Sequence, residues 1–580
     1  MLLQRLREYS ERLALPPTLY NEAPVRYIIE LDADGRLLNR QPTDTADPSS
    51  PRTRRGQRRL VPQIQRASGI KSFLLADKAD YSLGHVGENG KPERVAACHA
   101  AFLDLLEICA VQTGEAAVGA VQHFLRSDPL AQLGLDDTFS PGDTVTFRVD
   151  GAFPIDLPSV RAFWAAENDP AAKEAPVMQC LVCGERRPVL DRLQGKIKGV
   201  PGGQTSGTSI VSANADAFES YGLHASLIAP TCADCGERFT KAANDLLANE
   251  RTRIIMGGMA FIFWTRDGVA FDLRTFLSDP KPDDVKALFE SVRKGGRVPD
   301  VDDTKFYATA LSGSGGRAVV RDWLDTTVGE VKDHLAGWFS LQRIVGPYGE
   351  EPQPLGLYAL AAATVRDAQK ELAPPTPRSL LRSALTGTPL PPVLLYQAVR
   401  RNRAEQGITR PRAALIKLVL LSNQTTDKED SMVQLDQDNP RPAYRCGRLL
   451  AVLEQIQHQA IPSAGQTIVD RFFGTASSAP ASVFGRLIRG AQPHLGKLQR
   501  DRRGAYVALQ RRLEDVLAGL PASGFPRVLT LEDQGVFALG YYHQRAFDRA
   551  QAREAAERHK AGAAPAEDES AVDEDLPGND

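Results

Sequence analysis

The stretches CLVCGE at residues 180–185 and CADCGE at residues 232–237 decide how the middle of this chain folds. Each holds a C-x-x-C pair, in which the chain bends so that both sulfur atoms face one ion. Four thiolates in two such pairs match the tetrahedral shell of zinc, and they predict a structural site made of Cys180, Cys183, Cys232 and Cys235. The 48 residues between the pairs would form an insertion whose base the metal closes.

Two other interpretations of these cysteines stay open: unrelated pairs of reduced thiols, or a redox pair. With four protein ligands the zinc ion would keep no open position, so we expect it to be structural and not catalytic. The other three cysteines, Cys98, Cys109 and Cys446, are predicted to be small buried apolar residues. Seven cysteines are too few for a disulfide scaffold in a chain of 580 residues.

A Gly-rich loop, KIKGVPGGQTSGTS at residues 196–209, lies between the two cysteine pairs. It combines bare backbone N–H groups, hydroxyls, an amide and two lysines, which together can follow phosphates or enter a DNA groove. It is not a Walker A loop, because no Gly-Lys-Ser/Thr follows at the required place. A flexible hairpin tip explains the same composition equally well, so both interpretations stay open.

The remaining patterns predict an α+β chain with several domains. Residues 1–20 read as a helix closed by Pro16, residues 25–38 as a β-hairpin around the turn 32–35, and residues 93–125 as helical. Residues 441–549 are helical throughout, with Leu449, Val452 and Ile456 at helical spacing. We expect five segments: a mixed region 1–140, a strand-rich region 141–275 with the four-cysteine zinc site, a mixed to helical region 276–430, a helical bundle 431–555 and an acidic disordered tail 556–580.

Charge is distributed unevenly along the chain. The 70 Lys and Arg residues nearly balance the 72 Asp and Glu residues, giving a net charge of −2. Residues 52–71 nevertheless hold seven cations and no acid, residues 441–550 hold 15 cations and 8 acids, and the last 20 residues hold seven acids. The cluster at 52–59 suggests a disordered basic arm. The near-neutral total therefore hides two basic regions that could face DNA or RNA.

The C-terminal helices supply a second set of candidate cations. If 495–520 is one helix at about 100° per residue, then Lys497, Arg500 and Arg511 lie opposite the apolar residues. Arg502 and Asp515 spoil this pattern, and an ordinary solvated face remains the alternative. The binding candidates here are Lys497, Arg500, Arg511, Arg486 and Arg489, whose charges suit a strand of phosphates.

Several stretches resemble one known family. YNEAPVRYIIELDADGRLL, RASGIKSFLLADKADYSLG, the segment 180–222 and FYATALSGSGGRAVVRDWL are similar to the large subunit of the type I-C CRISPR Cascade complex, the Cas-eight-c or Csd-one family. The similarity runs from the N-terminus to about residue 550. It implies a non-enzymatic subunit of a crRNA-guided complex that recognises the protospacer-adjacent motif (PAM) in duplex DNA, promotes R-loop formation, guides the displaced strand and docks a helicase–nuclease.

The resemblance also implies partners and site residues. The partners are crRNA, double-stranded target DNA, the backbone and guide-handle subunits of Cascade, and the helicase–nuclease. The leading residues for PAM contact are Lys196, Lys198, Gly203, Gln204, Thr205 and Ser206, followed by Arg66, Ser68 and Lys71. The family does not always show both C-x-x-C pairs, so the zinc prediction rests on this chain's own cysteines.

The main rival function is a metal-dependent nuclease acting on DNA. Such an enzyme needs clustered carboxylates or His–Asp pairs around a metal ion. The nine histidines are scattered and none precedes an Asp, while Asp32, Asp34, Asp436 and Asp438 lie in turn-like stretches. A free transcription factor is a third possibility, disfavoured because no helix-turn-helix stands out. We therefore expect a protein without catalytic activity.

Two further expectations concern location and gene expression. The most apolar run, residues 254–264, is about half the length of a membrane span, and no signal peptide is recognised, so we expect a cytoplasmic protein. Met432 is the only methionine after Met259, and residues 428–429, Lys-Glu, can be encoded as AAGGAG, a ribosome-binding sequence. Because family members resemble fusions with the small Cascade subunit, we predict a second product of 149 residues that starts at Met432.

Overall fold

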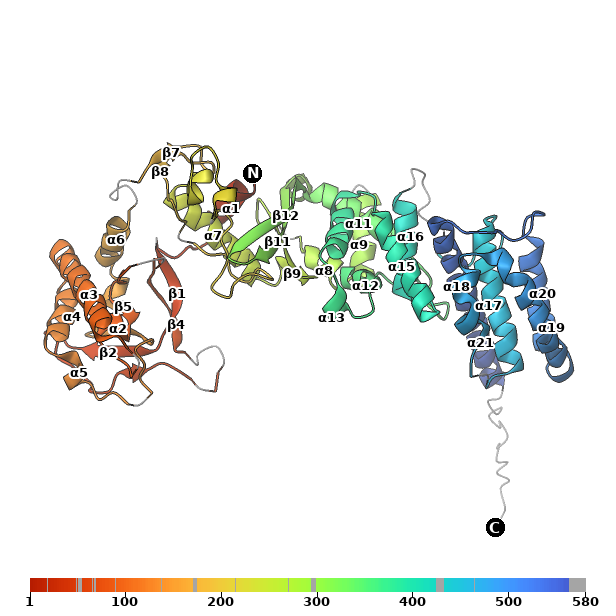
Figure 1. Ribbon diagram of the computed structural model, residues 1–580, viewed down its shortest axis with the longest axis horizontal. Helices are drawn as coiled ribbons and strands as arrows, with labels where there is room; N and C mark the ends of the chain where they lie inside the picture. Colours follow the sequence, from red (N-terminus) through yellow and green to blue (C-terminus); the bar gives the residue numbers. More distant parts are fainter. Residues whose placement is uncertain are drawn as a thin grey trace, which may run out of the picture. The chain divides into compact units, whose positions relative to one another are not determined.

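The structure is a computed structural model of the chain (Figure 1). It describes residues 1–580 apart from 18, 48, 51–54, 65, 67–68, 89, 137, 170–174, 194, 214, 270, 294–298, 424–431, 464 and 563–580. The chain divides into two compact units: Met1–Ala248 with Gly313–Val319, and Asn249–Ser312 with Val320–Asp580. The short segment Gly313–Val319 is the tip of a hairpin whose two strands otherwise belong to the second unit.

A four-stranded sheet with the order β3-β2-β6-β5 organises the N-terminal part of the first unit. Its strands are β2 (Tyr27–Leu31), β3 (Thr43–Asp44), β5 (Ala76–Lys78) and β6 (Thr144–Val149), and a separate antiparallel pair joins β1 (Tyr20–Val25) to β4 (Gln57–Pro62). The helices are α1 (Leu2–Ser10), α2 (Ala79–Ser82), α3 (Pro92–Thr113), α4 (Ala116–Arg126), α5 (Pro129–Gln132) and α6 (Pro158–Glu167). Alternate residues of β2 are buried with Phe102, Phe124 and Phe147, as expected for a strand with one face on a core.

Three local predictions in this part need correction. The predicted hairpin at 25–38 keeps only its turn and one bridge, Leu31 with Leu37, because β2 pairs instead with the distant parallel strand β6. The first helix ends at Ser10 and does not continue to Pro16. The basic arm is partly ordered in β4, where the Arg59 guanidinium lies 2.5 Å from an Asp156 carboxylate oxygen, whereas residues 51–54 lie outside the described residues.

The rest of the first unit carries the cysteines and consists mostly of turns. A two-stranded hairpin, β7 (Val177–Gln179) with β8 (Arg186–Pro188), is followed by the Gly-rich loop and by the 3₁₀ helices η3 (Asp216–Phe218) and η4 (Ala225–Ile228). The amphipathic helix α7 (Ala233–Ala248) then buries Phe239, Ala243 and Leu247. These elements set the positions of the candidate site.

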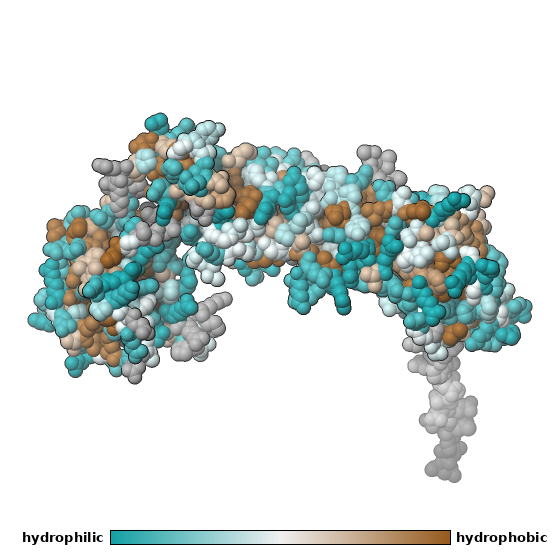
Figure 2. Space-filling model, in the orientation of Figure 1, coloured by the Kyte–Doolittle hydropathy of each residue, from teal (hydrophilic) through white to brown (hydrophobic). Residues whose placement is uncertain are grey.

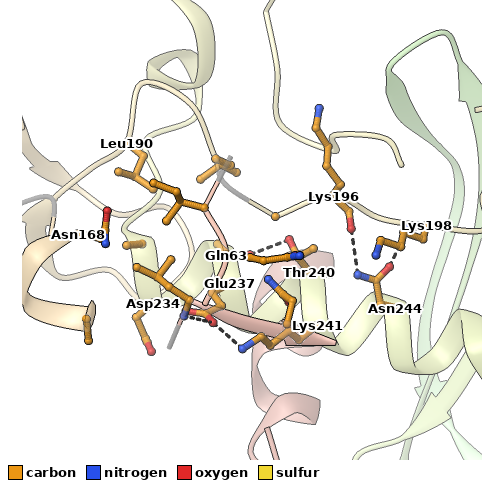
Figure 3. A pocket seen from close by; sticks show the side chains of 18 of the residues that line it. Gln63, Asn168, Leu190, Lys196, Lys198, Asp234, Glu237, Thr240, Lys241 and Asn244 are labelled. Atoms are coloured by element: carbon orange, nitrogen blue, oxygen red, sulfur yellow. Dashed lines mark hydrogen bonds and ion pairs between the residues drawn. The ribbon is translucent and has the colours of Figure 1, made fainter. Parts of the chain in front are cut away.

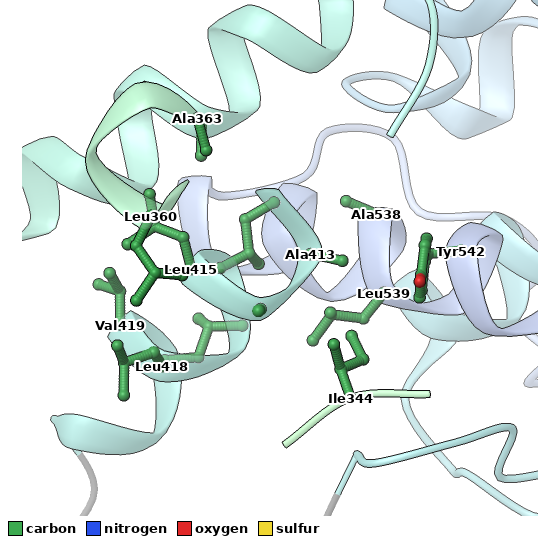
Figure 4. Packing of buried hydrophobic residues seen from close by; sticks show 14 of the residues in the cluster. Ile344, Leu360, Ala363, Ala413, Leu415, Leu418, Val419, Ala538, Leu539 and Tyr542 are labelled. Atoms are coloured by element: carbon green, nitrogen blue, oxygen red, sulfur yellow. The ribbon is translucent and has the colours of Figure 1, made fainter. Parts of the chain in front are cut away.

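The second unit begins with a four-stranded sheet of order β12-β11-β10-β9, covered by helices. The strands are β9 (Arg253–Met256), β10 (Met259–Thr265), β11 (Lys305–Ser314) and β12 (Arg317–Thr327). The helices are α8 (Leu273–Leu277), α9 (Pro282–Arg293), α10 (Pro299–Asp302), α11 (Val328–Gln342), α12 (Leu357–Ala362), α13 (Ala368–Glu371), α14 (Pro375–Thr386), α15 (Pro392–Glu405) and α16 (Arg410–Ser422). Figure 4 shows Leu415 of α16 beside Leu360 of α12, and Leu539 of the last helix near Ile344, within one buried cluster.

Five helices complete the second unit as a bundle, and they confirm the predicted α-helical C-terminal region. They are α17 (Pro442–Ala460), α18 (Ile468–Ala476), α19 (Phe484–Asp501), α20 (Arg503–Ala518) and α21 (Leu531–Gly562). Helices α17 and α21 cross at glycines: a Cβ on Gly447 would lie 2.0 Å from the Phe537 carbonyl oxygen, and one on Gly540 would lie 2.1 Å from the Tyr444 oxygen. The two backbones approach too closely for side chains at these positions.

One helix of the described chain, α3, is long and apolar enough to span a membrane by length and composition alone. Core helices of globular proteins meet the same criterion. Helix α3 buries Val95, Cys98, Phe102, Leu106 and Cys109 in the core of the first unit. On the face of the molecule shown in Figure 2, hydrophilic and hydrophobic residues are interspersed.

Candidate metal centre and nucleic-acid interface

The first cysteine pair forms the turn of the β7–β8 hairpin. The Cys180 N–H donates to the Glu185 carbonyl oxygen at 2.9 Å, and the Gly184 N–H donates to the Cys180 carbonyl oxygen at 2.8 Å. Gly184 has φ +80°, a left-handed conformation that glycine adopts without steric cost. The glycine after this C-x-x-C pair therefore allows the bend that turns both sulfur atoms inward.

The second pair lies at the start of α7, where one helical turn separates Cys232 from Cys235. A β-bridge joins Cys232 to Val189 of the first hairpin, and the Cys232 N–H lies 3.4 Å from the Cys180 sulfur. The ligand atoms of Cys180, Cys183, Cys232 and Cys235 all lie within 4.8 Å of one another. Sulfur atoms around a tetrahedral zinc ion are roughly 3.8 Å apart, so the four residues could hold such a metal ion after a small contraction.

The burial and the thiol pKa values of the four cysteines are also consistent with a metal site. Cys180, Cys232 and Cys235 are buried, and Cys183 is half-buried. The hydrogen bond from Cys235 lowers the pKa of the Cys232 thiol to about 5, whereas donating that proton raises the pKa of Cys235. Metal ligation requires thiolates, and this cluster favours one even before an ion binds. The predicted grouping of all four cysteines is confirmed.

The Gly-rich loop, residues 196–209, is held at its base by backbone and side-chain contacts within the first unit. Ile197 and Thr208 exchange two backbone hydrogen bonds of 2.8 and 2.7 Å. The Asn244 side chain on α7 accepts from the Lys198 N–H at 2.7 Å and donates to the Lys196 carbonyl oxygen at 2.9 Å (Figure 3). The loop is thus fixed to the helix that also carries the second cysteine pair.

A second support for the loop is the hairpin tip Gly313–Val319. The Gly313 N–H donates to the Pro201 carbonyl oxygen at 2.7 Å, and Ser209 is bonded on both sides, to Gly316 at 2.8 Å and to Ala318 at 2.9 Å. A Cβ on Gly313 would lie 2.1 Å from the Gly203 nitrogen, so only glycine permits this approach. The loop and the tip form one surface with side chains from both.

The predicted loop residues differ in how free they are. Lys198, Gln204, Thr205 and Ser206 are exposed, Gly203 is half-buried, and the half-buried Lys196 donates from Nζ to the Ser209 hydroxyl at 3.0 Å. A cavity of about 550 Å³ with a mixed lining lies beside the loop. Lys196, Lys198 and Ser206 of the loop line it together with apolar residues such as Leu190 and with the acidic Asp234 and Glu237 (Figure 3). The structure therefore brings the loop candidates together on one accessible surface.

The second group of candidates for PAM contact, Arg66, Ser68 and Lys71, does not form one exposed surface in the described residues. The Arg66 guanidinium pairs with the buried carboxylate of Asp77, donates to the Lys71 carbonyl oxygen at 2.7 Å, and lies over the Phe73 ring at 3.8 Å. Arg66 is therefore engaged within the first unit, whereas the Lys71 side chain is exposed. Ser68 lies outside the described residues.

Sequence reasoning did not find Arg317 in the hairpin tip. Arg317 forms a parallel bridge with Ser209 of the loop, and its guanidinium carbon lies 4.0 Å from the centroid of the Phe218 ring. The stretch SGSGGR at 312–317 offered a signal, because two glycines before an arginine resemble the composition of the Gly-rich loop. Its pairing with a segment more than 100 residues away could not be predicted from local patterns.

The single helix assumed for residues 495–520 is wrong, since α19 ends at Asp501 and α20 begins at Arg503. Arg502 sits in the break with φ −149° and donates to Gln459 at 2.9 Å, which explains why it fell on the wrong face of the helical wheel. Lys497 and Arg500 thus belong to α19, and the exposed Arg511 belongs to α20.

Helix α19 carries a stripe of four exposed cations, Arg486, Arg489, Lys497 and Arg500, called the α19 stripe below. They fall within roughly 80° of the helical wheel and extend over about 21 Å, while Leu487, Leu495 and Leu498 are buried on the opposite side. None of the four forms an ion pair with a described carboxylate; Arg486 lies over the Phe472 ring at 5.4 Å. This stripe is more regular than the one predicted from the sequence.

The acidic pairs considered for a nuclease are used in turns. Asp32 accepts hydrogen bonds from the backbone N–H groups of Asp34 and Arg36, and Asp436 accepts one from Asp438. Among the residues that the structure describes, only the four cysteines form a group of metal-binding side chains within reach of one ion.

A comparison with protein families identifies the chain. The model of the CRISPR-associated protein Cas_Csd1 family matches residues 3–547. The chain belongs to the Csd1 family. The predicted resemblance is therefore confirmed over nearly the whole sequence, and no curated protein matches this chain. A Csd1 protein is a CRISPR-associated Cascade subunit and works together with other components of a CRISPR effector.

Proposed function

We propose that this Csd1 protein is the non-catalytic large subunit of a type I-C surveillance complex. In this role it recognises the PAM in duplex DNA, promotes R-loop formation, stabilises the displaced strand and helps to recruit the helicase–nuclease. Its other partners are crRNA and the backbone and guide-handle subunits, and it acts in the cytoplasm. The observation that carries the proposal is the Gly-rich loop, whose backbone is fixed at both ends while Lys198, Gln204, Thr205 and Ser206 are exposed.

The residue types of the loop suit short-motif recognition. Gln, Thr and Ser side chains can contact base edges in a groove, and Lys neutralises phosphates. Since guide pairing reads the target sequence, the protein needs only a few base contacts beside it. A loop anchored on α7 and on the hairpin tip can present these groups with little loss of conformational entropy on binding.

The cysteine cluster supports this role by holding the insertion together. We propose that it binds zinc, whose four positions would all be taken by sulfur. The bound ion would then supply folding free energy to the β7–β8 hairpin and to the start of α7. With its four protein ligands it would have no position for substrate.

The α19 stripe is the proposed path of the displaced strand, with Arg511 as a separate contact on α20. Four cations over about 21 Å can follow several phosphates of one strand without reading bases. The stripe lies in the segment downstream of Met432, which we propose is also made separately as a small subunit. Met432 is half-buried against the core of the second unit, and residues 424–431 before it lie outside the described residues. Met432→Leu should remove a short product from cells.

The test of PAM recognition compares two DNA substrates. Replacing Lys196, Lys198 and Gln204 by Ala in the assembled complex should abolish binding to a PAM-bearing duplex and spare binding to a target whose strands are already open. The matched control is Arg186→Ala with Arg187→Ala, two exposed cations of β8 that lie outside the loop. Equal loss of binding on both substrates would contradict PAM reading by the loop.

A further inference from the structure

An exposed aromatic residue, Tyr221, lies at the tip of a tight turn next to η3. Ser220 and Leu223 form an isolated bridge, and the Leu223 N–H donates to the Ser220 carbonyl oxygen at 2.9 Å. The two central residues have positive φ, +55° at Tyr221 and +70° at Gly222. This is the pattern of a type I′ turn, which favours Gly, Asn or Asp at both central positions.

Tyrosine is therefore an unfavourable residue for this backbone. A non-glycine residue in the left-handed region costs roughly 1 kcal/mol or more unless its surroundings compensate. The Tyr221 side chain receives no compensation from packing, because the residue is 98% exposed. The next position carries glycine, as the turn prefers. The exposed ring therefore adds no packing that would offset the cost of this backbone conformation.

The turn is braced so that the ring points outward. The Glu219 carboxylate accepts a hydrogen bond from the Ala225 N–H at 3.1 Å through one oxygen and pairs with His224 Nδ1 through the other. These two contacts close the base of the turn below Tyr221. The backbone of the turn is fixed by the chain itself, and the Tyr221 side chain extends from it into solvent.

The turn is connected to the Gly-rich loop through Arg317. The Arg317 guanidinium carbon lies 4.0 Å from the Phe218 ring centroid, three residues before Tyr221, and Arg317 pairs with Ser209 of the loop. Phe218 is itself 45% exposed. Phe218 and the Arg317 guanidinium thus connect the turn that carries Tyr221 to the base of the Gly-rich loop at Ser209.

We propose that Tyr221 stacks on an unpaired nucleobase of the target DNA, next to the duplex that the Gly-rich loop holds. Every nucleobase has a π-face, so stacking on an aromatic ring needs no particular sequence, and nearby cations attract the same strand. The proposal rests on the proposed function of the loop. A protein contact at Tyr221 is the competing outcome that the test must separate.

The positive φ at Tyr221 allows a variant that removes the ring without destabilising the turn. Tyr221→Gly removes the ring and relieves the positive φ, so the fold should be as stable as the wild type or more stable. Tyr221→Phe keeps the ring and should bind like the wild type. Loss of one stacking contact is worth about 10-fold in affinity. We expect Tyr221→Gly to weaken binding of the assembled complex to a partly opened, PAM-bearing target by that factor, and Tyr221→Phe to leave it unchanged.

A fluorescent base identifies the contact. With 2-aminopurine placed in turn at each nucleotide flanking the PAM, one position should be quenched by the wild type and by Tyr221→Phe but stay bright with Tyr221→Gly. Unchanged affinity and identical fluorescence for all three proteins would overturn the proposal. Failure of the Gly variant to assemble with the other Cascade subunits would assign Tyr221 to a protein contact, and this would also overturn it.

The loop variant keeps the two proposals distinguishable. If the Lys196, Lys198 and Gln204 replacements abolish duplex binding while Tyr221→Gly behaves like the wild type, PAM reading by the loop holds and base stacking fails. If the loop replacements have no effect, the proposed function of the loop fails. In that case a fluorescence change with Tyr221→Gly would still report a base contact, but not one beside a PAM held by the loop.

Discussion

The Gly-rich loop in the first unit and the α19 stripe in the second both place cations at the surface, but they are positioned by different forces. The loop contributes no residue to the two large hydrophobic clusters. It is held by backbone hydrogen bonds, by the Asn244 side chain and by the burial of Ile197 and Val200. The stripe is held by a helix whose opposite face is buried in a large apolar core.

The kind of support determines how each surface responds to substitution. If zinc occupies the four cysteines as proposed, the metal site and the few hydrogen bonds should fail together when one ligand is lost, because each depends on the others. A helical face loses its cations one at a time, since packing on the far side maintains the helix. We therefore expect abrupt effects of single substitutions near the loop and graded effects on the stripe.

The largest expected effect follows from Cys232→Ser. Removing one thiolate should release the metal and destabilise the cluster by several kcal/mol, since structural zinc contributes on the order of 10 kcal/mol in small peptides. Elemental analysis of protein purified without chelator, together with thermal unfolding, measures both effects. Leu181→Ser in the same knuckle is the control, because Leu181 is exposed. Wild-type protein that contains no zinc would contradict the prediction.

The next largest effect concerns the helical bundle. A Gly→Ala substitution should destabilise it only where two helix backbones are in close contact. Gly447→Ala places a methyl group against the Phe537 carbonyl oxygen and should cost about 3 kcal/mol through overpacking. Gly490→Ala in α19 meets nothing within 4 Å and should stabilise its helix by about 0.5–1 kcal/mol. Hydrogen exchange in peptides from α17 and α21 measures the difference. Equal protection in both variants would show that the crossing can relax.

Acid should weaken the bundle through His543. Complete burial lowers the pKa of His543 to about 3, so the folded bundle keeps this imidazole neutral while the unfolded chain protonates it near pH 6.5. Stability is therefore present above pH 6.5 and is lost as the pH falls toward 3, by about 2 kcal/mol between pH 7 and pH 5. Hydrogen exchange in α21 at the two pH values tests this. His543→Asn should remove this part of the pH dependence, and His458→Gln, at an exposed position, should retain it.

The smallest effect is expected on the α19 stripe. Arg489→Gln with Arg500→Gln should lower the salt dependence of single-strand binding by about 1.4 in the slope of log K against log salt, and should leave unfolding unchanged. Arg527→Gln with Arg553→Gln removes two exposed cations outside the stripe and serves as the control. An identical slope in both double variants would remove the stripe from the proposed strand path.

Local patterns predicted those parts of the molecule in which local chemistry decides the structure. The spacing of the two C-x-x-C pairs identified all four members of the cluster, and the 3–4 periodicity of Leu449, Val452 and Ile456 identified α17. Each of these signals lies within two turns of one helix or within one tight bend. The sequence also placed Gln204, Thr205 and Ser206 on one loop, and the structure leaves all three exposed.

The failures have a common physical cause in contacts between distant segments. Strand β2 pairs in parallel with β6. The segment after the turn at 32–35, which was predicted to be its hairpin partner, therefore forms only a single bridge. Arg317 forms a β-bridge with Ser209 of the loop, and no periodic pattern in the sequence predicts this pairing. The break at Arg502 lacks a proline, and the residue there adopts φ −149° while its guanidinium bonds to Gln459 on α17.

The hairpin tip Gly313–Val319 has a consequence for dividing or recombining the gene. A fragment that stops at residue 248 would keep the cysteines and the loop, yet leave the Pro201 carbonyl and both backbone groups of Ser209 without their partners from the tip. A chimera joined near residue 249 would take its Gly-rich loop from one parent and Gly313, Gly316 and Arg317 of the hairpin tip from the other. Exchange between relatives should therefore succeed only when the two segments, more than 100 residues apart, are inherited together.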